Sequence, residues 1–380
     1  MTRSIAFSWM LAFGTALCLF TEAHADSAPD VSPTCTTVVQ RTSNDVLLSR
    51  GAFCQLSAPL EYIIKDEANA EVGRVEISAY AYSDNPLNRL EWPLKFRFRT
   101  RLVSGGGAGL QIKPIVECGD HCTVAPNAGV SLAIGGLSNE LVVALTPNMG
   151  GQQKKTIAPY VEYKVAKTGE SFEDGASVVG FYGQAHIPRI RCDVGLAKAN
   201  TQGCVYFDAP AVMRSVKTND SDVDESAIHI KESLEAGKPG EFISRGDGTI
   251  LESSEATALE RLRSEPERRE NRRLSKNQCI AQYGKVSGQC TFTGDPDEEP
   301  SACDCDEYPF AATRQGAASG NFSVKRIDSG DNRRAGARFG CFLASQRVLD
   351  GEKFYIDVEP DGQANTDAPC EAGYSTSVSK

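Results

Sequence analysis

Residues 301–313 read Ser-Ala-Cys-Asp-Cys-Asp-Glu-Tyr-Pro-Phe-Ala-Ala-Thr, and this stretch decides how the C-terminal part of the 380-residue chain is interpreted. It holds three carboxylates within four residues, Asp304, Asp306 and Glu307. Because like charges repel, folding these carboxylates together is costly unless a cation compensates them. The flanking cysteines are expected to fix the backbone through disulfides, and the proline stiffens the exit of the stretch.

The residues that follow predict a small mixed element order. Residues 321–328 alternate as a strand, 329–336 resemble a turn, 337–348 are a helix candidate rich in small residues, and 353–358 alternate as a closing strand. The predicted order is therefore strand, strand, helix, strand, with carboxylates on the first strand and Asn332 before the helix. Carboxylate and amide oxygens of this kind suit Mg²⁺, Mn²⁺ or Ca²⁺.

The chain upstream has a different texture. From about residue 34 to residue 216 it alternates in short β-type runs, such as 94–100 and 140–145, between Gly, Pro, Asn and Asp clusters. Several such runs predict an all-β, sandwich-like domain. Near residue 217 the composition becomes polar and acidic, and helical patterns follow at 227–237 and at 255–274. We therefore expect a β-sandwich-like domain at 26–216 and a second domain at 222–380.

The N-terminus predicts export. Residues 1–25 combine a basic start, a short apolar run and a small-x-small exit, which is the pattern of a secretory signal peptide. Twelve cysteines remain after it, six in each half of the chain. An exported chain meets an oxidising environment, so three disulfides within each half and none between them are expected. The protein is predicted to be secreted, either to the outside of the cell or to the periplasm, without a membrane partner.

Composition excludes several classes of protein. The chain is 41% hydrophobic and 24% charged, which does not fit a disordered or multi-span membrane protein. The formal net charge of −10 argues against a protein that coats nucleic acid through bulk positive charge. It leaves open an enzyme that cuts nucleic acid at a local site.

The C-terminal half resembles the NucA/NucB-type secreted bacterial deoxyribonucleases over roughly residues 222–358. The matching motifs are Cys305–Ala311, Asp331–Asn332, Arg347–Gly351 and Phe354–Tyr355, with looser matches at His229–Ile230, Glu235–Pro239 and Asn271–Arg273. The order aspartate, glutamate, aromatic residue and proline at residues 306–309 is the most specific part of this resemblance.

The resemblance implies an α+β nuclease domain similar to ββα-metal nucleases, in which a hairpin and a helix hold one divalent cation, Mg²⁺ or Mn²⁺, against the scissile phosphate. It implies that Asp306 is the general base, in place of the histidine used by most nucleases of that architecture. Glu307 is then an acidic partner of the metal or the base, and Asn332 is a metal ligand or orients the water. Asp304 matches the first aspartate of members that read Asp-Arg-Asp-Glu.

The chain departs from the family at two points. Cys305 stands where some members have an arginine, so phosphate binding is assigned instead to Arg326, Arg333 and Arg334. No acidic residue occurs between Arg333 and Leu349, where one branch of the family places a further ligand. The arginines at 268–273 are expected to form a salt-bridged helix face, with DNA contact as the less favoured interpretation, and the histidine at 229 is expected to be structural.

The predicted function is a secreted, metal-dependent endonuclease that hydrolyses DNA phosphodiester bonds with little sequence preference. Two alternatives stay open. The acidic loop could belong to a calcium-binding extracellular adhesive module, or the nuclease could be a delivered toxin with an inhibitor or immunity protein as its partner. DNA cleavage with added Mg²⁺ or Mn²⁺, compared with cleavage in EDTA, separates the first alternative from a nuclease.

Overall fold

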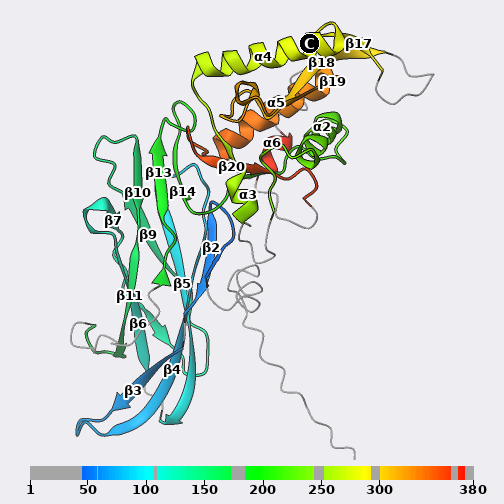
Figure 1. Cartoon of the computed structure of the whole chain (residues 1–380). Helices are drawn as coiled ribbons and strands as arrows, with labels where there is room; N and C mark the ends of the chain where they lie inside the picture. The colour runs from blue at the N-terminus through cyan, green and yellow to red at the C-terminus, as the bar shows by residue number, and fades with distance from the viewer. Residues whose placement is uncertain are drawn as a thin grey trace, which may run out of the picture.

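The computed structural model describes residues 45–57, 59–106, 109–172, 185–243, 252–291, 300–360 and 367–372. The predicted signal peptide lies outside these residues. Figure 1 shows an elongated β-rich unit formed by the N-terminal part of the chain and, at one end of it, a smaller unit that carries the helices. Within the described ranges, no helix combines the length and the apolar character needed to cross a membrane.

The N-terminal unit consists of antiparallel strands in three sheets. Their orders are β1-β2-β4-β5-β9-β7 with β3 beside β4, β12-β11-β6-β8, and β10-β13-β14. The bounds are β1 (Asp45–Leu47), β2 (Ala52–Leu56), β3 (Leu60–Lys65), β4 (Glu71–Asp84), β5 (Trp92–Gly105), β6 (Leu110–Glu117), β7 (Cys122–Val124), β8 (Val130–Leu132), β9 (Leu141–Pro147), β10 (Lys154–Ile157), β11 (Tyr160–Lys167), β12 (Ala185–His186), β13 (Ile190–Val194) and β14 (Gln202–Tyr206).

Alternation along β5 explains how these sheets pack. Every second residue from Trp92 to Thr100 is buried, as a strand with one face on the core requires. Phe96 and Phe98 meet the ring of Tyr163 on β11 edge to face, at centroid distances of 6.2 and 5.5 Å. The largest sheet and the four-stranded sheet therefore share one apolar core. The prediction of a β-rich N-terminal part is confirmed.

The C-terminal unit combines short strands with five helices among the described residues. The strands are β15 (Val212–Met213), β16 (Leu259–Glu260), β17 (Gly288–Cys290), β18 (Ser301–Tyr308), β19 (Ser323–Asp328) and β20 (Lys353–Ile356). The helices are α2 (Asp224–Glu235), α3 (Glu252–Ala256), α4 (Glu265–Tyr283), α5 (Ser329–Ser345) and α6 (Pro369–Ala372). The strands form the sheets β15-β20-β16 and β17-β18-β19.

Two predicted helices have different bounds in the structure. The expected helix at 255–274 is divided into α3, the short strand β16 and α4, which begins at Glu265 with Pro266 in its first turn. The helix expected at 337–348 begins earlier, at Ser329. Asp328 causes this difference, because its carboxylate accepts hydrogen bonds from the backbone N–H groups of Gly330 and Asp331 and so caps the helix. Asn332 therefore lies in the first turn of α5 and not in a preceding loop.

A second apolar core holds the C-terminal unit together. Phe342 on α5 and Phe354 on β20 belong to it, as do Ala211, Met213 and Val216. Val212 pairs in parallel register with Tyr355, so the chain enters the C-terminal sheet before the acidic stretch that begins near residue 217. The short segment 211–216 is thus part of the C-terminal core.

Disulfides connect elements within each unit. The five bridges among the described residues are Cys118–Cys122, Cys192–Cys204, Cys279–Cys305, Cys290–Cys303 and Cys341–Cys370. Cys54 is also disulfide-bonded, and its partner is not among the described residues. None of the five bridges joins the two units, and the three in the C-terminal unit agree with the number predicted for it.

We expect proteolysis without reductant to release disulfide-linked peptides that contain these five pairs, because each pair lies within bonding distance in the folded chain. Mass spectrometry of the digest before and after reduction measures this pairing. Free thiols at Cys303 and Cys305, or a bridge between the two units, would contradict the structure.

Candidate active site

The hairpin of β18 and β19 places the three carboxylates on two different faces. Successive side chains of a strand point to opposite sides, so Asp304 and Asp306 share one face while Cys305 and Glu307 share the other. Cys305 is bonded to Cys279 of α4, which identifies the second face as the one that packs on α4. The charge repulsion expected from three neighbouring carboxylates is thereby reduced.

Asp306 is held from two directions. Its side chain is buried, and its Oδ1 accepts a hydrogen bond of 2.9 Å from the backbone N–H of Glu307. Its Oδ2 lies 2.9 Å from Nδ1 of His229 on α2, and Nε2 of the same imidazole lies 3.0 Å from Oγ of Ser323 on β19. His229 therefore connects α2 to both strands of the hairpin, and it fixes the orientation of the predicted base.

Glu307 lies on the other face and is half-buried. One carboxylate oxygen accepts a hydrogen bond of 3.1 Å from the backbone N–H of Ala311, and the other accepts one from the hydroxyl of Ser275 on α4. Burial raises the pKa of Glu307 above its ordinary value. A nearby cation would stabilise the charged form of this carboxylate.

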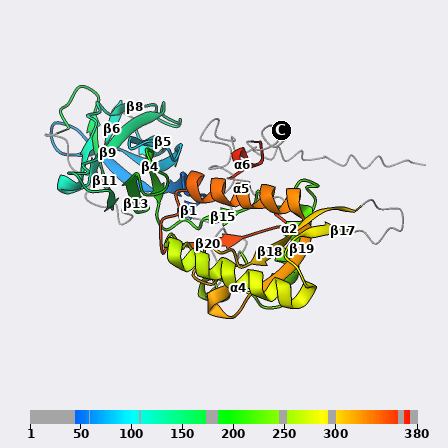
Figure 2. The ribbon, with the colours of Figure 1, turned by 90° about the horizontal axis from the view of Figure 1, so that it is seen from above.

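A cleft of about 410 Å³ brings the predicted residues together. Asp306, Glu307 and Asn332 all line it. Figure 2 shows α4 and α5 on opposite sides of β18 and β20. On α5 the lining includes Gly336 and Gly340, where the absence of a side chain leaves room beside the carboxylates. Phe310 and Phe339, with rings stacked at 4.0 Å, form an apolar part of the wall.

Four arginines also line this cleft, Arg261, Arg263, Arg268 and Arg272. Arg268 and Arg272 are four residues apart on α4, so they lie on one face of that helix. Both also pair with Glu265 at 3.6 Å, as the predicted salt-bridged helix face requires. The less favoured interpretation of this stretch, contact with a phosphate backbone, agrees with their place in the cleft.

Asn271 fixes α4 to the segment that follows β18. Its buried amide nitrogen donates to the backbone oxygens of Ala311, at 2.9 Å, and Thr313, at 3.2 Å. Its amide oxygen accepts from the backbone N–H of Ala318 at 2.9 Å. The looser sequence resemblance included this asparagine, and its role is to hold the arginine-bearing helix against the cleft.

The arginines predicted to bind phosphate lie elsewhere. Arg326 pairs across the hairpin with Cys305, on the face that packs on α4. Arg333 pairs with Asp304 at 3.2 Å, and Arg334 donates to the backbone oxygen of Asp222 at 2.6 Å. None of the three, nor Asp304, lines the cleft. Phosphate binding by these three arginines stays a prediction, and their absence from the lining of the cleft reflects that proximity to Asn332 in sequence does not decide which face of α5 or β19 a side chain occupies.

Asp331, the neighbour of Asn332, has a structural role. Its buried carboxylate accepts hydrogen bonds from the backbone N–H groups of Glu225 and Ser226, at 3.0 and 3.1 Å, at the start of α2. Burial raises the pKa of Asp331 to about 6. The two residues thus divide their tasks: Asp331 joins α5 to α2, and Asn332 faces the cleft.

We expect Asn271→Ala to lower the free energy of unfolding of the C-terminal unit by about 2 kcal/mol, since it removes three hydrogen bonds to the backbone, two of them buried. Urea denaturation measures this loss. The matched control is Asn321→Ala, because Asn321 is exposed and its side chain accepts a bond from half-buried Lys238. Equal effects of the two substitutions would contradict the role assigned to Asn271.

Comparison with known families identifies the part of the chain that carries this cleft. Residues 252–357 match the family described as Deoxyribonuclease NucA/NucB, and this range includes Asp306, Glu307 and Asn332 but not His229. Comparisons with curated proteins and with solved structures gave no match. The family consists of deoxyribonucleases, so an enzyme that acts on DNA is indicated. Residues 252–357 therefore form a deoxyribonuclease domain of the NucA/NucB family.

Proposed function

We propose that the protein is a secreted, metal-dependent endonuclease that hydrolyses DNA with little sequence preference, and that its C-terminal unit works as a ββα-metal-like nuclease. The observation that supports this most is the cleft in which Asp306, Glu307 and Asn332 face arginines of α4. Guanidinium groups recognise phosphates, which carry no sequence information. The disulfides favour an oxidising compartment and hence export.

The cleft offers ligands suited to a hard divalent cation. Glu307 and Asn332 would hold Mg²⁺ or Mn²⁺ through carboxylate and amide oxygens. The described residues contain no group of three or more His, Cys, Asp or Glu side chains placed to hold a metal. Mg²⁺ sites that also bind substrate phosphates typically use only one or two carboxylates from the protein. When bound, the cation would neutralise the negative charge of the phosphate and of the leaving oxygen.

Asp306 is proposed as the general base. Each oxygen of an ionised carboxylate accepts more than one hydrogen bond, so the bonds from Glu307 N–H and His229 leave acceptor sites free. An attacking water can donate to such a site and transfer its proton there. His229 does not line the cleft, which leaves it the task of holding Asp306 in place. Arg268 and Arg272 bind the substrate phosphates.

A calcium-binding adhesive module is not favoured. The family match covers the acidic strand itself and is to deoxyribonucleases. Of the three carboxylates of β18, only Asp306 and Glu307 line the cleft, while Asp304 pairs with Arg333 outside it, so the three do not form the ligand set of a calcium loop.

The first test of this proposal compares Asp306→Asn with His229→Ala. Asn keeps the size of the side chain but cannot accept a proton, so kcat should fall by about 100-fold or more. Loss of the residue that orients a catalytic group costs less, about tenfold. Plasmid cleavage at saturating Mn²⁺, with folding checked by thermal melting, measures both. A dead histidine variant beside an active aspartate variant would make the imidazole the base.

A second test addresses the cation. EDTA should abolish cleavage, and added Mg²⁺ or Mn²⁺ should restore it, because the cleft alone cannot neutralise the leaving oxygen. Asn332→Ala should lower activity at limiting Mn²⁺ and regain part of it at high Mn²⁺, since a missing ligand weakens binding without removing the base. Asp306→Asn is the matched control, and high Mn²⁺ should not rescue it. Full activity in EDTA would refute the role of the cation.

A further inference from the structure

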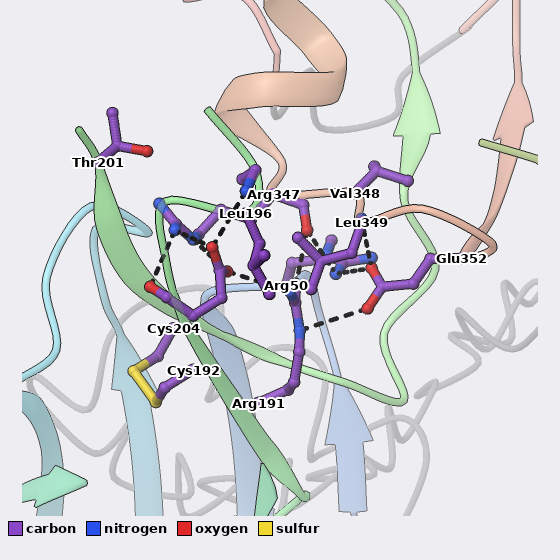
Figure 3. A network of polar contacts seen from close by, with 12 residues as sticks. Arg50, Arg191, Cys192, Leu196, Thr201, Cys204, Arg347, Val348, Leu349 and Glu352 are labelled. Carbon is purple, nitrogen blue, oxygen red and sulfur yellow. Dashed lines mark hydrogen bonds and ion pairs between the residues drawn. A yellow bond between two sulfur atoms is a disulfide. The ribbon is translucent and has the colours of Figure 1, made fainter. Parts of the chain in front are cut away.

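The interface between the two units contains a buried network of charged side chains, which Figure 3 shows from close by. Arg50 and Arg191 come from the N-terminal unit, and Arg347 and Glu352 come from the C-terminal unit. At its centre lies Asp193 on β13, which is fully buried. Its Oδ2 lies 2.8 Å from Nε of Arg347 and 3.1 Å from Nη1 of Arg191. Nothing in the proposed chemistry uses this network.

Arg347 shows that the network holds the end of α5. The backbone φ of Arg347 is +50°, a left-handed conformation that residues other than glycine rarely adopt. The backbone N–H of Val348 reaches back to Leu343 at 3.0 Å, as in a helix end that normally uses glycine here. The backbone oxygen of Arg347 accepts a bond of 2.6 Å from Arg191. Groups of the N-terminal unit therefore hold both the side chain and the backbone of this residue.

The turn that follows Asp193 reaches the cleft directly. Oδ1 of Asp193 accepts a bond of 3.2 Å from the backbone N–H of Ala197 and so orders the turn. The backbone oxygen of Ala197 accepts from Arg261 at 3.4 Å, and that of Leu196 accepts from Arg263. Both arginines line the cleft, and Arg261 also donates to the backbone oxygen of Leu343, in the last turn of α5.

We propose that Asp193 is a positioning residue of the nuclease: through its turn and through Arg347 it places Arg261 and Arg263 where they bind DNA phosphates beyond the scissile one. This inference rests on the proposed function, because it takes the cleft as the DNA site. Arg263 is exposed and has five N–H donors, so its bond to Leu196 leaves donors for a phosphate. The N-terminal unit would then complete the substrate path from the carboxylates to the interface.

The charge balance of the network explains why one carboxylate matters. Three arginines meet two carboxylates there, and burial lowers the pKa of Arg191 to about 10, which reflects the cost of keeping that guanidinium charged out of water. Without the charge of Asp193, Glu352 alone would face the three guanidinium groups. We expect the arginines to separate and the turn to lose its order.

The experiment measures binding of a fluorescent DNA duplex to the full chain in EDTA, by anisotropy, at several salt concentrations. Asp193→Asn should raise Kd by about tenfold or more and reduce the slope of log Kd against log salt by about two, because both arginines lose their placement. Arg263→Ala removes one of these two phosphate contacts and should reduce the slope by about one. The control is Asp208→Asn, which breaks the exposed pair with Arg189 in the same unit and should change neither quantity.

Each outcome decides a separate point. An unchanged slope for Asp193→Asn or for Arg263→Ala overturns the inference, even if the melting temperature falls. If Asp193→Asn does not fold, Arg191→Lys, which keeps the charge but loses the donor to Arg347, is measured in the same way, and an unchanged slope overturns the inference too. If the wild-type chain binds DNA with the expected slopes but never cleaves it, the proposed function fails and the assignment of the DNA path stands.

Discussion

Keeping three carboxylates on one short strand is the constraint around which the C-terminal unit is organised. The pleat of β18 directs Asp306 toward α2 and Glu307 toward α4, and each meets donors suited to its place. His229 and a backbone N–H hold the first, while Ser275 and another backbone N–H hold the second. The helices around the hairpin are therefore needed for the charges as much as for the apolar core. Asp304 is satisfied outside the cleft, which leaves two carboxylates for chemistry.

The cleft combines groups from several elements that are distant in sequence. Its carboxylates come from a hairpin, its amide from the first turn of α5, and its arginines from α4 and from the segment after β16. Bonds from the N-terminal unit reach Arg261 and Arg263, so the β-rich part touches the same cleft from its far end. Because both units contribute contacts to this cleft, their relative position must be fixed. The buried ion pairs between the units fix it, which a flexible connection alone would not do.

Local sequence patterns predict much of the fold and part of the cleft, but they fail where the contacts are long-range. Alternation gave the β-rich unit, and the acidic motif pointed to Asp306, Glu307 and Asn332, which the fold brings to one cleft. The contact of His229 with Asp306 joins residues 77 apart, and periodicity carries no information about it. The charged residues of α4 predict a solvated face, because the spacing of their charges indicates salt bridges along the helix. The cleft beside the helix cannot be predicted from that spacing. The start of α5 at Ser329 depends on the cap formed by Asp328, which the spacing of apolar residues does not indicate.

The disulfides of the hairpin have a consequence for when the enzyme can work. Cys279–Cys305 and Cys290–Cys303 fasten β18 on both sides of Asp304, and loops of this size contribute about 3 kcal/mol each when closed. A newly made chain with reduced cysteines has neither fastening, so the strand that carries the proposed base is held only by weaker contacts. If the chain is exported as proposed, oxidation completes this strand only after the chain leaves the reducing cytoplasm, so the chromosome of the producing cell would not meet the finished nuclease.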